Sequence, residues 1–464
     1  MTSATEDAAG PAYPDAGERR REQRAWYFYD WANSAYVTTT LTVLFSPYLT
    51  TVAEQAACGF VSSEERKCTV DLSVLGIPVS PGSLSLYVIT FTTLISAILL
   101  PIVGAMTDRS HHKKQLLGGL AWTGATAASA MVFVAGTNWQ LGVVLLFVAN
   151  LCLASSVVVY DAILCDIATP DERDRVSSRG WALGYLGGGL LLVINLVLVQ
   201  GHAAFGLSTG AAVRISILMA GLWWGGFTLI PFLLLRNRPP IAVVPEQGGA
   251  LHRSFGQLFV TLKQSRAFPM TLLFLIAYLF FNDGVQTVIY ASSLYASGQL
   301  GFGSNVLIMI ILIVQFVAFG GALLFGRIAQ RYGSKQTILG ALVVWIVIVC
   351  GAFFLPEKQL VPVLVFGVAV GIVLGGTQAL SRSLYSQFVP KGREAEYFSL
   401  YQACERGTSW LGTLAFGVVH QITDSYRPAI LTLVVFFVVG FVLLLRVDAR
   451  RAISDAGNEQ PAVI

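Results

Sequence analysis

The chain contains twelve apolar stretches of about twenty residues, separated by short polar joints, and each is long enough to cross a bilayer as a helix. Hydrophobic residues make up 55% of the 464 residues and charged residues only 12%, against about 25% charged in typical soluble domains. Because a lipid interior offers backbone groups no water, a chain this apolar must satisfy them within helices. The sequence therefore predicts an all-α integral membrane protein with twelve transmembrane helices.

The predicted spans fall into two sets of six. The first set covers residues 26–51, 84–106, 115–136, 140–165, 178–200 and 213–235, and the second covers 269–292, 305–325, 336–355, 361–384, 397–419 and 428–445. The polar, proline-bearing segment 236–268 reads as a linker between them. This division predicts an N-terminal tail over 1–25, one bundle over 26–235, the linker, a second bundle over 269–447 and a tail over 448–464.

The basic residues predict the orientation, because Lys and Arg accumulate on the cytoplasmic side of a membrane protein. With these spans, 24 of the 30 Lys and Arg residues, Arg382 among them, fall on the side of both termini, five fall on the other side and Arg406 lies inside a span. Both termini are therefore expected in the cytoplasm. No signal-peptide pattern precedes the first span, and the preference for Arg over Lys favours a bacterial plasma membrane.

The predicted outer loop 52–83 contains Cys58 and Cys68, whereas the other four cysteines fall within helices. If this loop faces an oxidising space, a disulfide between Cys58 and Cys68 closes a short loop. The alternative is two free thiols in a mobile loop, and the sequence leaves both open.

The two sets of spans show an internal repeat. Asp30 and Asn33 in the first span match Asp283 and Gln286 in the seventh, an acid followed three residues later by an amide. The two side chains of each pair share a helix face. The loops after the second and eighth spans also match, as do residues 170–173 and 390–393 after the fourth and tenth, so the chain is predicted to hold two copies of a six-helix unit.

The loops after the second and eighth spans resemble the signature of the major facilitator superfamily, which is Gly, three residues, Asp-Arg, one residue, Gly and then basic residues. The first copy has His111 in place of the second glycine, and the second copy has Gln330 in place of the acid. The resemblance implies two pseudo-symmetric six-helix bundles. We expect the motif to hold neighbouring helix ends together as a cytoplasmic gate, although ordinary topogenic charges are the alternative. The predicted gate residues are Gly104, Asp108, Arg109, Lys113, Gly326, Arg331, Gly333 and Lys335.

A narrower resemblance lies in residues 26–36, 174–188, 378–383 and 390–398. These segments are similar to those of the autophagy-related vacuole effluxer family and its bacterial relatives. The resemblance implies a facilitator-fold transporter, and the fungal members of the family are associated with amino-acid export from the vacuole.

Charged side chains at bilayer depth cost about 2.5 to 3.5 kcal/mol each, so each one needs a partner or a function. The candidates for substrate binding or proton coupling are Asp30, Asn33, Asp161, Asn282, Asp283, Gln286, Gln378, Glu405 and Arg406. From the repeat we expect Asp30 and Asp283 to face one another across a central cavity. The alternative for Asp30 is a structural acid near the membrane surface, and Asp161 is either a gate or a packing residue.

Glu405 and Arg406 are adjacent and project about a quarter-turn apart, so each is expected to find its partner elsewhere. Our hypothesis is that Arg406 neutralises an acid from the first or seventh span, or a substrate carboxylate. Glu405 or Asp283 then takes up a proton. A solvated position at the inner end of the helix is the alternative.

Soluble-enzyme signatures are missing from the sequence. His111 and His112 lack the spacing of a zinc site, and the glycines 187–189 lie in a predicted helix, so we predict no catalytic residue, metal or cofactor. The expected partners are a small solute, the bilayer and protons, with neither nucleic acid nor an obligate protein partner.

The predicted function is secondary active transport by alternating access, coupled to an ion or proton, with amino acids or similar metabolites moving outward. One alternative is export of amphipathic drugs or metabolites. The other is a non-transporting receptor or scaffold built on a carrier fold.

Overall fold

The computed structural model describes residues 13, 15–63, 66–74, 76–240, 267–407 and 410–464. Within them the chain is helical apart from one two-stranded hairpin and short joints, and ten helices are long and apolar enough to cross a membrane. Most of the predicted linker, residues 241–266, lies outside the described residues.

Each half contributes a series of long helices. The N-terminal half contains α1 (Ala16–Tyr36), a π-helical segment (Val37–Leu44), α2 (Phe45–Cys58), β1 (Leu72–Val74), β2 (Ile77–Val79), α3 (Leu84–Arg109), α4 (Lys113–Ala130), α5 (Trp139–Ile167), α6 (Arg173–Gln200) and α7 (Thr209–Leu234). The C-terminal half contains α9 (Pro269–Leu294), a π-helical turn (Tyr295–Gln299), α10 (Ser304–Tyr332), α11 (Ser334–Ala352), α12 (Leu360–Gln387), α13 (Glu394–Gly407), α14 (Trp410–Thr423), α15 (Tyr426–Arg446) and α16 (Ala449–Asp455). Short 3₁₀ turns at Pro81–Ser83, Met131–Phe133, Pro170–Glu172 and His202–Phe205 join some of them.

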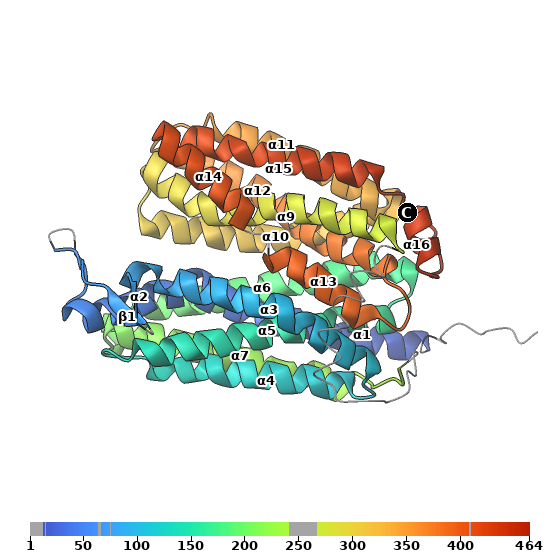
Figure 1. The fold of residues 1–464 in the computed structure, drawn as a ribbon, viewed down its shortest axis with the longest axis horizontal. Coiled ribbons are helices and arrows are strands. Elements are labelled where there is room, and N and C mark those ends of the chain that lie inside the picture. The colour runs from blue at the N-terminus through green and yellow to red at the C-terminus, as the bar shows by residue number, and fades with distance from the viewer. Residues whose placement is uncertain (1–12, 14, 64–65, 75, 241–266, 408–409) are drawn as a thin grey trace, which may run out of the picture.

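The two halves lie as two stacked layers, with α9 to α15 in one layer and α1 to α7 in the other (Figure 1). Trp224 is fully buried in an apolar core of the N-terminal half, and Trp345 is fully buried in one that belongs mainly to the C-terminal half. The start of α1 and the C-terminus lie at one end of the molecule, which we call the terminal end. The opposite end carries β1 and is called the hairpin end.

The first helix begins earlier than predicted. Residues 16–25, assigned to a tail from the sequence, form the start of α1, because Asp15 caps the helix by accepting a hydrogen bond from the Gly17 N–H at 3.1 Å. Asp30 therefore lies 14 residues into the helix, about 21 Å along its axis at 1.5 Å per residue. The early start gives Asp30 the depth that its match with Asp283 requires.

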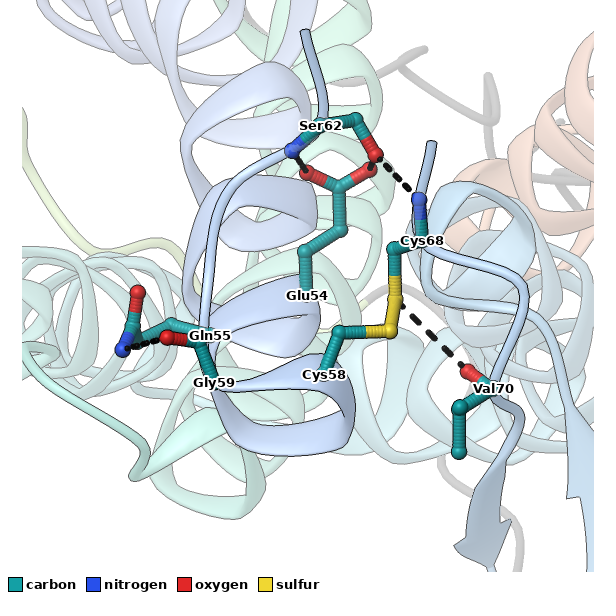
Figure 2. Close-up of a disulfide and its surroundings, with 7 residues drawn as sticks. All are labelled: Glu54, Gln55, Cys58, Gly59, Ser62, Cys68 and Val70. Carbon is teal, nitrogen blue, oxygen red and sulfur yellow. Dashed lines mark hydrogen bonds between the residues drawn. A yellow bond between two sulfur atoms is a disulfide. The ribbon is translucent and has the colours of Figure 1, made fainter. Parts of the chain in front are cut away.

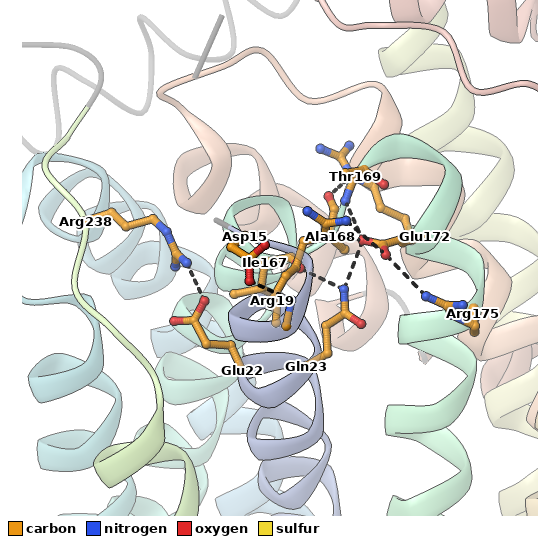
Figure 3. A network of polar contacts seen from close by, with 12 residues as sticks. Asp15, Arg19, Glu22, Gln23, Ile167, Ala168, Thr169, Glu172, Arg175 and Arg238 are labelled. Carbon is orange, nitrogen blue, oxygen red and sulfur yellow. Dashed lines mark hydrogen bonds and ion pairs between the residues drawn. The ribbon is translucent and has the colours of Figure 1, made fainter. Parts of the chain in front are cut away.

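A polar cluster holds this helical extension to the start of α6 (Figure 3). Arg19 Nε lies 2.8 Å from Glu172 Oε2, and Gln23 Nε2 donates to Glu172 at 3.1 Å and to the Ile167 carbonyl at 2.9 Å. Glu22 pairs with Arg238 at the beginning of the predicted linker. The contacts thus use Arg19, Glu22 and Gln23 of this segment, whereas Arg20, Arg21 and Arg24 are exposed.

The predicted span 397–419 falls on α13 and α14, which the structure describes on either side of residues 408–409. Glu405 and Arg406 lie near the end of α13.

The C-terminal segment, predicted as a tail over 448–464, contains the short helix α16 and contacts both halves. Asn458 Nδ2 donates to the carbonyls of Gln387 and Val389 at 2.8 and 2.7 Å, and the Ala462 N–H donates to Asp171 of the N-terminal half at 2.7 Å. This segment therefore bridges the two halves at the terminal end.

A disulfide joins Cys58 and Cys68 at the hairpin end (Figure 2). Glu54 accepts hydrogen bonds from the N–H and the hydroxyl of Ser62 at 2.9 and 2.7 Å, and Ser62 Oγ accepts from the Cys68 N–H at 3.0 Å. These bonds return the loop toward the end of α2 and bring the two sulfurs together. Of the two states that the sequence left open, the structure has the bonded one.

Candidate functional site

A buried arginine connects the two halves at their interface. Arg382 in α12 is 3% exposed, and its guanidinium lies 3.0 Å from Asp30 Oδ2 of α1 and 3.3 Å from Asp161 Oδ1 of α5. Its Nε and Nη2 also donate to the hydroxyl and the carbonyl of Ser177 in α6, at 3.0 and 3.1 Å. A buried charge is tolerated when it is both paired and hydrogen-bonded, and Arg382 meets both conditions with groups from the other half.

Aromatic rings surround the guanidinium. Its Cζ lies 4.8 Å from the ring centroid of Trp26 and 5.4 Å from those of Tyr160 and Trp181. Trp26 and Tyr160 stack on one another with centroids 4.2 Å apart. Cation–π attraction strengthens when water is excluded, so these rings help to hold Arg382 between the two acids.

A glutamine extends this cluster into the C-terminal half. Gln402 in α13 donates to Asp161 Oδ2 at 2.9 Å and to Glu405 Oε2 at 3.1 Å, and its carbonyl oxygen accepts from Arg406 Nε at 3.3 Å. The candidate acids and the candidate arginine are therefore joined through a residue that the sequence analysis did not single out.

Two amides continue the same network toward α9 and back to α12. Asn282 Nδ2 donates to the backbone carbonyl of Glu405 at 3.1 Å, and Gln378 Nε2 donates to Asn282 Oδ1 at 2.9 Å. Six of the nine predicted candidates belong to this interface network: Asp30, Asp161, Asn282, Gln378, Glu405 and Arg406.

The interface network holds three carboxylates, on Asp30, Asp161 and Glu405, against the two guanidiniums of Arg382 and Arg406. It carries one negative charge in excess when all five groups are ionised. Asp30, Asp161 and Arg382 are buried, whereas Glu405 and Arg406 are half-buried. The most exposed charged groups of the network are thus the pair on α13.

The prediction for Arg406 is wrong in one respect. Within the described residues Arg406 has no ion pair with an acid of the first or seventh span, and it binds Gln402 of its own helix instead. The arginine that neutralises Asp30 is Arg382, which the sequence analysis counted among the basic residues at the membrane surface. Its place four residues after Gln378 in an apolar helix is the signal that could have found it.

The three remaining candidates bind elsewhere. Asp283 is fully buried and accepts a hydrogen bond from the Gly412 N–H in the first turn of α14 at 2.8 Å, and its Oδ1 has no hydrogen-bond partner among the described residues. Asn33 donates to the Tyr29 carbonyl of its own helix at 2.7 Å, and Gln286 is half-buried in α9. Asp30 and Asp283 therefore have separate partners rather than a shared space between them.

The first copy of the predicted gate motif joins the two halves at the terminal end. Asp108 at the end of α3 accepts from the N–H groups of Ala395 and Glu396, both at 2.8 Å, and so caps the start of α13. A Cβ atom on Gly104 would lie 2.6 Å from the Ala395 carbonyl oxygen, so glycine permits the close approach. Lys113 pairs with Asp166 at 2.9 Å, and Arg109 is exposed.

The second copy makes a different set of contacts. A Cβ atom on Gly326 would lie 2.6 Å from Ser178 Cβ in α6, which repeats the close approach of the first copy. Lys335 instead donates to the Leu445 and Val447 carbonyls at the end of α15, at 3.2 and 2.7 Å. Arg331 is exposed, and Gly333 adopts the positive φ of 88° that favours glycine.

Further bonds close the terminal end. Arg173 Nη1 donates to the Ser386 carbonyl at 2.7 Å, and Gln387 Nε2 donates to the Pro170 carbonyl at 2.8 Å. On the same side α13 packs against α3 and α5, whereas α14, toward the hairpin end, packs against α9 and α15 of its own half. The structure thus captures a conformation in which the halves are bonded together at the terminal end.

Comparison with solved structures identifies the class of the protein. The fold is similar to that of a bacterial homologue of the iron transporter ferroportin, with a TM-score of 0.66, 13% identity and coverage of 92% of this chain and 98% of that one. It is also similar to the major facilitator superfamily transporter FucP, with a TM-score of 0.64, 13% identity and the same coverage. The predicted fold is confirmed: the chain has the major facilitator fold.

Sequence comparison then gives the family. Residues 18–457 match the family described as vacuole effluxer Atg22 like, and the chain belongs to that family. It is 30% identical over 446 residues to the uncharacterized MFS-type transporter YxiO of Bacillus subtilis, covering 95% of this chain and 98% of that protein. It is 24% identical to autophagy-related protein 22-1 of Penicillium rubens, covering 98% and 95%. The chain is therefore a multi-pass membrane transporter and not an enzyme.

Proposed function

We propose that the chain carries amino acids or similar small zwitterions across the membrane by alternating access, coupled to a proton. The observation that carries this proposal is the half-buried pair of Glu405 and Arg406 at the interface of the two halves, joined through Gln402. A zwitterion presents one ammonium and one carboxylate a few bonds apart. The carboxylate of Glu405 can bind the ammonium, and the guanidinium of Arg406 can bind the carboxylate.

The charge of the interface network supports the coupling. Three carboxylates face two guanidiniums, and an uncompensated charge at bilayer depth is costly. A proton on one carboxylate neutralises the network. One proton crossing is worth about 2.3 kcal/mol per 100 mV, enough for about a fifty-fold solute gradient.

The distribution of the charged residues between the two halves supports alternating access. Arg382 lies in the C-terminal half, and Asp30 and Asp161 lie in the N-terminal half, so opening the terminal end separates the guanidinium from both acids. Protonation of one acid weakens that attraction. We infer that proton uptake by the network favours opening of the terminal end.

Location and direction are part of the same proposal. The basic residues favour cytoplasmic termini, so the structure would be the outward-facing state, with the hairpin end toward the exterior. The bilayer is then a bacterial plasma membrane, and movement is outward.

Transport into proteoliposomes tests the proposal. We expect a labelled amino acid to accumulate when an imposed pH gradient is present, unlabelled zwitterions to compete, and Arg406→Gln and Glu405→Gln each to reduce uptake at least tenfold. Arg427→Gln, at a half-buried arginine in the first turn of α15 outside the interface network, serves as the control and should retain uptake. Competition by amphipathic drugs but not by any zwitterion would favour the drug-export alternative and refute the proposed substrate.

A further inference from the structure

A hollow of about 350 Å³ lies on the outside of the N-terminal half, between α1 and α7 at the terminal end. Its two parts differ in chemistry. The part that carries Arg20, Arg21 and Arg24 of α1 is basic, and the part formed by Ala25, Phe28, Ile230 and Leu234 is apolar. The lining residues are Gly17, Arg20, Arg21, Arg24, Ala25, Phe28, Ile230 and Leu234.

The basic part carries charge that the described chain does not compensate. Arg20, Arg21 and Arg24 are exposed and form no ion pair with any described acid. The neighbouring cations do: Arg19 pairs with Glu172 and Arg236 with Glu18. The described acids Glu18, Glu22 and Glu172 are therefore already paired with other arginines. The three remaining arginines share one hollow.

This arrangement is unfavourable unless an anion occupies it. Arg20 and Arg24 are four residues apart and lie on one face of the helix, where like charges repel one another. A bound phosphate between them would replace this repulsion with attraction.

The apolar part continues along the lipid-facing side of α1 and α7. Phe28 stacks on Phe227 with ring centroids 6.4 Å apart, and the next turn brings Trp31 onto Trp223 at 5.4 Å. On the same stretch of α7, Leu229 and Leu233 are 47% and 70% exposed, as expected for side chains that meet lipid. The hollow therefore has a basic part near the start of α1 and the end of α7, and an apolar groove that runs toward the bilayer interior.

We propose that this hollow binds one anionic phospholipid of the leaflet that meets the terminal end. The phosphate lies among Arg20, Arg21 and Arg24, and one acyl chain lies along the groove past Phe28 and Leu234. The apolar side chains of Phe28, Ile230 and Leu234 beside the three arginines favour a lipid over a free anion. The site is separate from the interface network and does not depend on the proposed substrate.

Native mass spectrometry of the delipidated full-length protein tests this site with phosphatidylglycerol and phosphatidylcholine of identical chains. We expect one phosphatidylglycerol to bind in preference to phosphatidylcholine. Because each basic residue near an anionic surface contributes about a fivefold factor in binding, the R20Q/R21Q/R24Q variant should bind on the order of a hundredfold more weakly. R20K/R21K/R24K, which keeps the charge, should retain most of the binding.

The matched control is R327Q/R446Q/R450Q, which removes three exposed arginines from the same end of the C-terminal half and should leave the affinity within about twofold. An equal loss in the control, or equal binding of the two lipids to the unmodified protein, would overturn the proposal. So would glycerol 3-phosphate binding as tightly as the intact lipid, because the groove would then contribute nothing. Unchanged thermal unfolding of the glutamine variant checks that it remains folded.

Discussion

The two copies of the internal repeat place matching acids in opposite settings. Asp30 of the N-terminal half pairs with Arg382 of the other half at 3.0 Å, whereas Asp283 of the C-terminal half bonds to the Gly412 N–H of its own half. Asp30 is held by a charge on the other half, across the interface that opens during transport. Asp283 is held by the start of a helix in its own half. The same residue type thus has one role between the halves and another within a half.

The gate motifs differ at the position of the acid. Asp108 caps a helix of the other half, whereas the uncharged Gln330 stands at the matching position, and the matched lysines Lys113 and Lys335 both bind within their own half. The glycines do not differ: Gly104 and Gly326 each permit a close approach between the halves. Close packing is thus needed at both symmetry-related contacts, whereas the charged contacts that lock the terminal end come from the N-terminal copy.

The largest effect is expected at Arg382. Arg382→Gln leaves Asp30 and Asp161 buried without their cation, and breaking a buried pair from one side costs about 3 to 5 kcal/mol. We expect a large loss of thermal stability in detergent and no measurable transport. Arg406→Gln removes the same charge from a half-buried position and should destabilise the protein much less.

A second variant separates stability from function at this pair. Arg382→Gln combined with Asp30→Asn removes the cation and one acid together, so it should recover part of the stability while transport stays lost. Equal stability of the single and double variants would show that the pair does not bind across the interface as described.

A smaller effect is expected at Asp108. Asp108→Asn keeps one acceptor oxygen and loses the charge, which weakens the cap on α13 by about 1 to 2 kcal/mol. Because the cap joins the halves, opening of the terminal end should become easier. Cys165 reports this, since its Sγ lies 3.9 Å from the Ser386 carbonyl of the other half. With Cys152, Cys350 and Cys404 replaced by alanine, maleimide labelling of Cys165 should rise several-fold; unchanged labelling would count against the gate role.

The sequence predicted the fold well because the bilayer imposes a single pattern. Apolar runs of fixed length predicted the helices, and the repeat around Asp30 and Asp283 predicted the two halves. The exception is a helical segment with a polar sequence. Residues 16–25 look like a tail in the sequence, but Glu172 and Arg238 bind them as the start of α1.

The candidate site was predicted in its residue types but not in its pairs. Burial cost singled out Asp30, Asp161, Glu405 and Arg406, and the structure brings them into one network. Which arginine meets Asp30 depends on how α12 packs against α1 and α5, and no local pattern encodes that distance. Gln402 was missed, although the sequence analysis singled out the amides of Asn282 and Gln378.

Asp283 should respond differently from Asp30. Asp283→Asn keeps an oxygen that accepts from the Gly412 N–H, so the stability should change by less than about 1 kcal/mol, whereas Asp283→Ala leaves that N–H unpaired and should cost about 1 to 3 kcal/mol. Thermal unfolding in detergent measures both. If Asp283 carries the coupled proton, the asparagine variant should also lose the pH dependence of uptake; retained pH dependence would assign the proton to the interface network.

The smallest effect is expected at Lys335, and it provides the sharpest test of the difference between the two copies. Lys335→Gln removes a cation from the carbonyl end of α15, an interaction worth about 0.3 to 1 kcal/mol, so the thermal unfolding temperature should fall slightly. Labelling of Cys165 should stay the same, because the hydrogen bonds of Lys335 within the described residues go to carbonyls of its own half. A rise in labelling equal to that of Asp108→Asn would mean that both copies lock the terminal end, and the asymmetry of the charged contacts would then have no functional meaning.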